Sequence, residues 1–266
     1  MSSIRAPAVA GVFYPGEAAA LRDAVDGLLG ELPLPHFRAD LPRALIAPHA
    51  GYIYSGPVAA SAFGRVAGAG AIFTRVVVIG PSHHVAFRGI AAPRASAFAT
   101  PLGDIPVDHA VITGIPGVQL ADEPHRREHA IEVELPFLQR ALGRGVFGLV
   151  PLVVGDTTGE EVAAALASFA DDPKTLVVVS SDLSHFLPYG AAARRDQATA
   201  AAIERLEGEE IRAEDACGWL PIRGWLDVAR QRSLRVERLD LRNSGDMAAG
   251  DRQSVVGYGA WAFWLN

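Results

Sequence analysis

The chain contains very little cysteine and lysine: Cys217 and Lys174 are the only residues of their types among 266. A lone cysteine excludes an internal disulfide bond and fits a reducing compartment, so we expect a cytoplasmic protein. No apolar run approaches the roughly 18 residues that a transmembrane helix needs. The first twenty residues also lack the basic start and apolar stretch of a secretory signal. We therefore expect neither membrane insertion nor export.

Blocks of like charge and two common catalytic motifs are missing as well. The formal net charge is −6 and is spread along the chain, which disfavours binding to nucleic acid or to an anionic membrane. Neither a P-loop nor a G-x-S-x-G pattern occurs, so no motif in the sequence supports phosphate-loop or serine-hydrolase chemistry. Half of the residues are apolar, which is enough for a sizeable core.

The apolar pattern predicts strands that alternate with helices. We predict helices over residues 18–29, 57–66, 130–142, 160–169, 191–206 and 218–230. We predict strands over residues 44–47, 75–79, 147–154, 175–179, 234–241 and 254–264. Residues 88–107 are typical of short strands and loops, and residues 32–35 of a connector. This alternation predicts one α/β domain spanning residues 1–266, with a mixed, mostly parallel central sheet and helices on both faces.

Histidine and aspartate follow three of the predicted strands directly. His49 comes after the first of these strands, His83 and His84 after the second, and Asp182 and His185 after the clearest buried strand. In open α/β sheets, ligands and catalytic groups collect at the carboxyl ends of strands. His83 and His84 are neighbours and point in opposite directions if the segment is extended, so we expect only one of them in a pocket.

Two pairs of side chains have the spacing of one helical turn. If a helical turn begins at Ser181, Asp182 and His185 lie on one face, where the carboxylate can orient the imidazole or share a metal with it. Alternatively, Ser181 or Asp182 caps a turn, which gives His185 no role. His129 and Glu132 lie at the start of the predicted helix 130–142, where a polar first turn is ordinary.

Two further features allow both a purely structural and a functional interpretation. Free cysteine is usually a small buried hydrophobic residue, and Cys217 matters only if it reaches the histidines, where thiolate and imidazole select Fe, Cu or Zn. Residues 125–129 match the H-x-x-E-H pattern of zinc peptidases through His125, Glu128 and His129. Pro124 precedes this pattern and places His125 at a frayed helix end or in a loop.

The segments that contain these candidate site residues, taken together and in order, resemble the Memo family, whose prokaryotic members are called AmmeMemoRadiSam system protein B. The matching segments are residues 47–56, 80–84, 128–136, 179–185, 217–218 and 254–258. The similarity extends from about Ala6 to the end of the chain. Several ordered motifs at compatible spacing are far more specific than any single one.

This resemblance implies a fold similar to the class III extradiol dioxygenases, which use non-haem Fe(II). It also implies a metal pocket made from His49, His83 and Cys217, since the family uses the first histidine of the pair at His83 and His84. The cysteine takes the place of the dioxygenase carboxylate, which alters the charge and the redox potential of the site.

The same resemblance gives roles to three neighbouring side chains. Asp182 and His185 would line the pocket with His129 beside them, and His185 or His129 would be the acid–base group. We expect Asp182 to orient a neighbouring imidazole, that of His185, without being an obligatory ligand.

Three functional hypotheses follow. The first is a metal-dependent redox protein of the Memo family, an oxidoreductase with Fe(II), or alternatively Cu or Zn, that binds O₂ or a small substrate. The second is a non-enzymatic module that binds a peptide or a protein, including proteins of the AmmeMemoRadiSam system, on a dioxygenase-like fold. The third is a zinc peptidase built on His125 and His129. None of them involves nucleic acid or a membrane.

Overall fold

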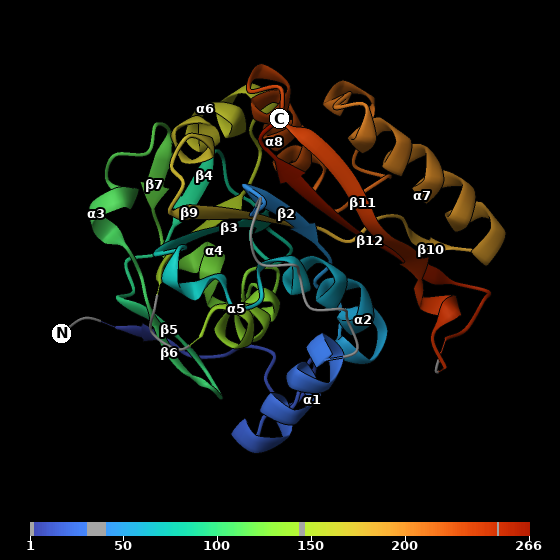
Figure 1. Cartoon of the computed structure of the whole chain (residues 1–266), viewed down its shortest axis with the longest axis horizontal. Coiled ribbons are helices and arrows are strands. Elements are labelled where there is room, and N and C mark those ends of the chain that lie inside the picture. The colour runs from blue at the N-terminus through green and yellow to red at the C-terminus, as the bar shows by residue number, and fades with distance from the viewer. Residues whose placement is uncertain (1–2, 31–40, 144–146, 249) are drawn as a thin grey trace.

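The computed structural model of the protein describes residues 3–30, 41–143, 147–248 and 250–266, so the connector predicted at residues 32–35 lies outside the described residues. A large mixed sheet runs through the molecule in the strand order β10-β12-β2-β9-β3-β8-β4-β7, with β11 beside β12 (Figure 1). Its strands are β2 (Ala44–Ala47), β3 (Arg75–Pro81), β4 (Ile90–Ala92), β7 (Val118–Leu120), β8 (Gly148–Val154), β9 (Thr175–Ser180), β10 (His185–Leu187), β11 (Arg235–Asn243) and β12 (Val255–Trp264).

Four parallel strands, β2, β9, β3 and β8, form the middle of this sheet. Residues 76–79 and 176–179 are continuous runs of valine, isoleucine and leucine, and every one of them is fully buried. Such runs are typical of parallel strands that are covered on both faces. Antiparallel strands flank this core, because β12 pairs with β2 on one side and β4 pairs with β8 on the other.

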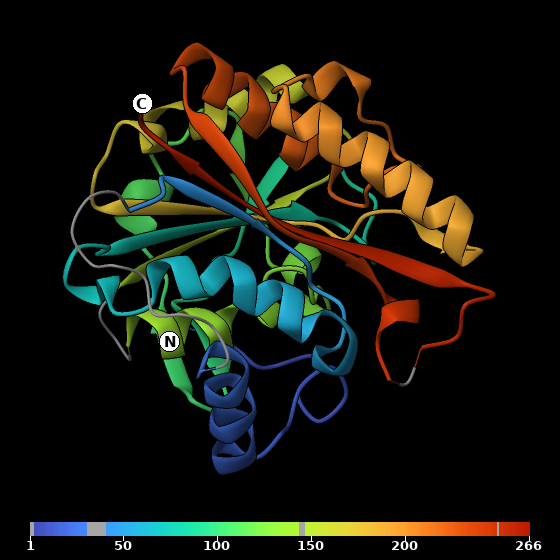
Figure 2. The same cartoon turned by 45° about the vertical axis from the view of Figure 1, so that its right-hand side comes forward.

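Helices cover both faces of the sheet. α1 (Ala18–Gly30), α2 (Tyr52–Phe63) and α5 (Leu135–Leu142) lie on one face, and α6 (Gly159–Ala170), α7 (Tyr189–Glu204) and α8 (Trp219–Gln231) lie on the other (Figure 2). The short helices α3 (His109–Ile112) and α4 (Glu123–Arg126) belong to connecting segments. Within the described residues, every helix is too short or too polar to cross a membrane. The predicted α/β class, with a mixed sheet between helical layers, is confirmed.

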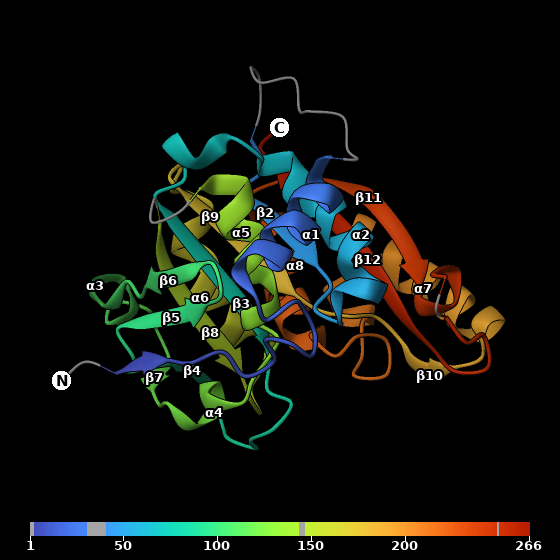
Figure 3. The same ribbon diagram turned by 90° about the horizontal axis from the view of Figure 1, so that it is seen from below.

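One buried carboxylate helps to hold the N-terminal segment against the rest of the molecule. A small sheet of β1 (Ile4–Arg5), β5 (Ala97–Thr100) and β6 (Gly103–Pro106) lies on the side opposite α7 (Figure 3). Arg5 of β1 forms a buried ion pair with Glu132. The Glu132 carboxylate also accepts hydrogen bonds from the Tyr14 hydroxyl (2.6 Å) and from the backbone N–H groups of Ala8 (2.7 Å) and Val9 (3.0 Å).

The helix predicted over residues 57–66 begins earlier than expected. α2 starts at Tyr52, so Pro57 lies inside the helix and not in its first turn. A proline inside a helix removes the hydrogen bond to the carbonyl four residues before it, which here belongs to Ile53.

The helix predicted over residues 130–142 begins later than expected. A 3₁₀ turn at Glu132–Glu134 precedes α5, which starts only at Leu135. The cause lies just upstream, where the Glu128 carboxylate accepts the backbone N–H groups of His129 (2.9 Å) and Ala130 (2.9 Å). These side-chain bonds fix the segment in a loop before the helix begins, so His129 and Glu132 do not share a helix face.

The buried ion pair gives a stability prediction. Glu132→Gln should lower the free energy of unfolding by about 3–5 kcal/mol, because it leaves the Arg5 guanidinium buried without its counter-charge. The matched control is Glu123→Gln, which breaks the exposed pair of Glu123 with Arg126 and should cost no more than about 1 kcal/mol. Urea unfolding curves measure both, and equal losses in the two variants would contradict the prediction.

Candidate metal centre

The parallel register of the central strands brings together three of the loops that carry candidate site residues. β2 and β3 both pair in parallel with β9, and Ala47 at the end of β2 lies opposite Ser180 at the end of β9. Parallel strands end at the same edge of a sheet, so the loops that follow them carry His49, His83 and Asp182 to one place. The side chains are therefore neighbours although they are far apart in the sequence.

The predicted helical turn at Ser181 is absent. The residues between β9 and β10 form no helical turn, and the N–H of Leu183 donates to the carbonyl of Gly257 in β12 (2.8 Å). A backbone that bonds another segment in this way cannot close its own helical turn. Asp182 and His185 consequently do not share a helix face, and His185 instead begins the short strand β10.

Cys217 reaches the same sheet edge from the loop before α8. Its N–H donates to the carbonyl of Asp182 (3.2 Å), and the N–H of Gly218 donates to the Ser181 hydroxyl (2.9 Å). A Cβ atom at residue 218 would lie 2.6 Å from the Cβ of Ser181. Only glycine therefore allows the loop to come this close and to present the thiol beside β9.

The structure brings His49, His83 and Cys217 into one group. One nitrogen or sulfur atom from each lies within 4.8 Å of the other two, and the Cys217 Sγ is 3.3 Å from the His49 Nε2. Two donors bound to one ion at about 2.0–2.3 Å lie no more than about 4.6 Å apart, so small side-chain rotations would let all three reach the same ion. Two imidazoles and a thiolate fit Fe, Cu or Zn and do not fit Mg or Ca.

His83 is held by a carboxylate that sequence reasoning did not single out for this role. Its Nδ1 lies 2.7 Å from Glu128 Oε1, and its backbone N–H donates to Glu128 Oε2 (2.6 Å). Burial of Glu128 acts to raise the pKa of its carboxyl, but the hydrogen bonds from His83 outweigh this and lower that pKa to about 2. The carboxylate is thus ionised, and Nδ1 of His83 donates to it.

His49 is buried and uncharged. Its Nδ1 contacts the Ser180 hydroxyl (2.7 Å), and its Nε2 faces Cys217. Burial lowers the pKa of this imidazole well below the ordinary value, and the neighbouring His83 and His129 lower it further. A neutral imidazole can present a lone pair to a metal ion without first losing a proton.

His129 lies beside the two predicted histidine ligands. Its ring stacks on that of His83 with centroids 4.5 Å apart, and its Nδ1 is 3.4 Å from Glu128 Oε1. Together with His83 and Glu128 it forms a second group of closely spaced ligand atoms. Burial and the neighbouring His83 lower the pKa of His129 to about 4, so this imidazole is also neutral near pH 7.

Asp182 contacts the predicted ligands directly. Its Oδ1 accepts the backbone N–H of His49 (2.9 Å), and burial raises the pKa of its carboxyl to about 7. In the described part of the chain Asp182 has no hydrogen bond to the His185 imidazole, so it steadies the backbone of His49 and not His185 as expected. His185 instead lines a cavity of about 360 Å³ together with His83 and Cys217.

Comparison with known proteins settles the family. Residues 5–262 match the family model described as "Memo-like protein". A MEMO1 family protein of Aquifex aeolicus is 33% identical over 268 residues, which cover 96% of this chain and 97% of that protein. A MEMO1 family protein of Thermotoga maritima is 35% identical over 276 residues, with 96% and 97% covered. The chain belongs to the Memo family.

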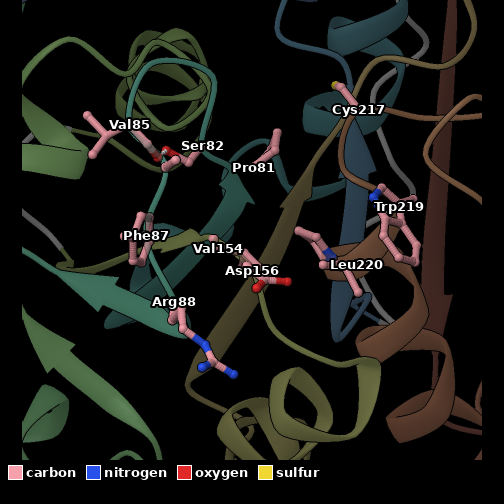
Figure 4. A pocket seen from close by; sticks show the side chains of 13 residues that line it. Pro81, Ser82, Val85, Phe87, Arg88, Val154, Asp156, Cys217, Trp219 and Leu220 are labelled. Carbon is pink, nitrogen blue, oxygen red and sulfur yellow. Dashed lines mark hydrogen bonds between the residues drawn. The ribbon is translucent and has the colours of Figure 1, made fainter.

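In this Memo-family chain a cleft of about 480 Å³ opens beside Cys217. Figure 4 shows Trp219 and Leu220 on one side of the cleft, facing the segment that carries Phe87 and Arg88 on the other. The lining is mainly apolar, and Arg88 and Asp156 add two opposite charges to it, with Arg88 lying away from Cys217 (Figure 4). Such a cleft can take an organic molecule against the thiol side of the histidine cluster.

The H-x-x-E-H pattern of residues 125–129 does not lead to a zinc peptidase site among the described residues. His125 is buried, its Nε2 hydrogen-bonds the carbonyl of Ala91 (3.0 Å), and its ring packs edge-on against Phe98. Neither metal-capable group among the described residues includes it, so the predicted pairing of His125 with His129 in a zinc peptidase is wrong.

Three buried residues of the site were missed in the sequence, namely Glu128 as the partner of His83, and Ser180 and Glu134 behind His49. All three lie within segments 128–136 and 179–185 that match the Memo family. A usable signal existed for Ser180, because a polar residue at the end of an otherwise apolar buried strand needs a hydrogen-bond partner. The partners themselves come from a distant loop and cannot be read from local pattern.

The environment of Cys217 predicts low thiol reactivity in metal-free protein. Burial and the neighbouring Asp182 raise the pKa of this thiol, so at neutral pH it holds its proton more firmly than free cysteine does. Alkylation by iodoacetamide should therefore be slower in the native, metal-free protein than in the same protein unfolded in urea, and it should speed up as pH rises. Equal rates in the folded and unfolded chains at neutral pH would contradict this assignment.

Proposed function

We propose that the protein is a metal-dependent redox protein that holds Fe(II), or alternatively Cu, on His49, His83 and Cys217; Zn fits the same donors but supplies no redox chemistry. The observation that supports it is the convergence of two imidazoles and one thiol at the carboxyl edge of the sheet. A bound iron or copper ion would supply one-electron redox chemistry toward O₂ or a small substrate. The proposal goes beyond family membership, which by itself assigns no reaction.

The residues of the chain have distinct roles in this proposal. His49 presents a neutral nitrogen, His83 presents Nε2, and Cys217 must give up its proton to become a thiolate ligand. Glu128 orients His83 and makes its imidazole a stronger donor through the hydrogen bond to Nδ1. His129 lies next to these ligands and His185 lines the adjoining cavity, so both are placed to take up or release a proton of a bound molecule.

The cleft in Figure 4 supports a small organic molecule as the second reactant. Trp219 and Leu220 would contact its apolar part and exclude water beside Cys217, while Arg88 would pair with an anionic group at the far end. The same open cleft also favours the second candidate, a module that binds a peptide or a partner protein. O₂ consumption by the metal-loaded protein would support the enzyme, and a partner complex that forms without metal would support the module.

Metal analysis of variants tests the ligand set. His49→Ala, His83→Ala and Cys217→Ser should each sharply reduce the metal content of anaerobically purified protein, because each removes a donor atom. His84→Ala and His125→Ala are the controls and should leave it unchanged, since His84 lies outside the converging group and His125 is tied to Ala91. Equal metal loss in His125→Ala and His49→Ala would show that the wrong histidines were chosen.

Asp182→Asn tests the role of the carboxylate that holds the His49 backbone. The variant should keep the fold and some metal, but bind the ion or react with O₂ about 10–100-fold less well, as is usual when a group that positions a ligand is lost. Titration with Fe(II) under anaerobic conditions, followed by exposure to O₂, measures both effects. Complete loss of metal would show that Asp182 is itself a metal ligand. A metal affinity and an O₂ reactivity equal to those of the wild type would show that Asp182 has only a structural role.

A further inference from the structure

The hydroxyl of Ser180 has three polar neighbours but only one proton to share among them. Its Oγ lies 2.7 Å from Nδ1 of His49, 2.7 Å from Oε1 of Glu134 and 2.6 Å from the carbonyl oxygen of Ala130. All four residues are buried, with exposures of 0–1%. The three contacts must therefore be satisfied by protons that the cluster itself carries.

One arrangement of protons satisfies all three contacts. The carbonyl of Ala130 can only accept, so at 2.6 Å it takes the single hydroxyl proton of Ser180. The Ser180 oxygen then has no proton left for Glu134, and the Glu134 carboxyl must donate its own. The other lone pair of the Ser180 oxygen accepts from His49, which places the imidazole proton on Nδ1.

The other arrangements bring two oxygen atoms together without a proton between them. If Glu134 were ionised, Ser180 would donate to it, and the bare oxygens of Ser180 and Ala130 would face each other at 2.6 Å. If Ser180 donated to His49 instead, the same clash would result. In addition, Oε2 of Glu134 has no hydrogen-bond partner among the described residues. An ionised carboxylate with one buried oxygen unpaired is costly, whereas a neutral acid tolerates it better.

We propose that Glu134 is a positioning residue: as a neutral carboxylic acid it donates to Ser180, which thereby accepts from His49 and keeps that imidazole in its Nδ1–H form. Nε2 of His49 is then bare and faces Cys217. The inference rests on the proposed function only for the use of this lone pair, as a metal ligand. Burial, which raises the pKa of Glu134 well above the ordinary value, acts in the same direction.

The acid behind each predicted histidine ligand is then in a different charge state: Glu128 behind His83 is ionised, and Glu134 behind His49 is neutral. His83 donates to the ionised carboxylate of Glu128, whereas His49 donates to a neutral hydroxyl that is itself fixed by a neutral acid. An ionised acceptor strengthens the donor power of its imidazole more than a neutral one does. The site therefore contains one strong and one weaker imidazole donor, although the sequence shows two similar histidines.

Nitrogen NMR of the metal-free, reduced protein tests the inference without any activity. With ¹⁵N-labelled histidine, long-range proton–nitrogen correlations show which ring nitrogen of His49 carries the proton, and His49→Ala identifies its signals. We expect protonated Nδ1 and bare Nε2 in the wild type, and loss of this fixed form in Ser180→Ala. Protonated Nε2, or a rapid average of the two forms, in the wild type would overturn the proposal whatever the metal content.

The protonation of Glu134 has its own measurement in the isosteric variant Glu134→Gln. The infrared spectrum of the wild type near neutral pH should contain a carboxylic acid band that disappears in this variant, and an unchanged spectrum would overturn the proposal. The glutamine amide still donates to Ser180, so Glu134→Gln should keep the Nδ1–H form and the wild-type affinity for Zn²⁺. Ser180→Ala should bind Zn²⁺ about 10–100-fold more weakly, and an unchanged affinity there would likewise count against the inference.

Discussion

The whole site depends on the parallel register of β2, β9 and β3. These three strands are buried on both faces, and their apolar residues fix them side by side with their carboxyl ends level. Each end releases a short loop, so His49, His83 and Asp182 meet without any local relation in the sequence. A slip of the register by one residue would turn every strand side chain to the opposite face, so the packing of the core also fixes the spacing of the site.

One short segment supports the register from outside the sheet with three buried carboxyl groups. Glu128 accepts from His83, Glu132 accepts from Arg5 and the N-terminal segment, and Glu134 contacts Ser180 at the end of β9. Buried acids are costly unless each has a partner. Because each of the three has a different partner, this one segment joins the β3 loop, the N-terminus and β9 around the histidine cluster. The match of residues 128–136 to the Memo family falls on this segment.

The arrangement also separates two kinds of surface at Cys217. On one side lies the apolar cleft with Trp219 and Leu220, and on the other the smaller cavity with His83 and His185. Cys217 lines both of them. Its own position depends on Gly218, since no larger residue fits against Ser181. A single glycine in a loop thus determines whether the cysteine can join the histidines.

The sequence by itself determined the class of the fold, the core strands and the candidate residues, because buried parallel strands and the motifs after them have strong local patterns. It placed the starts of α2 and α5 wrongly, since Pro57 is tolerated inside a helix and the Glu128 side chain holds the residues before α5 in a loop. Only the tertiary structure decided that His125 faces Ala91, that Asp182 supports His49, and that Glu128, Ser180 and Glu134 stand behind the histidines. These contacts join residues from distant segments, and their partners are chosen by the register of the sheet and by burial, which no local pattern encodes.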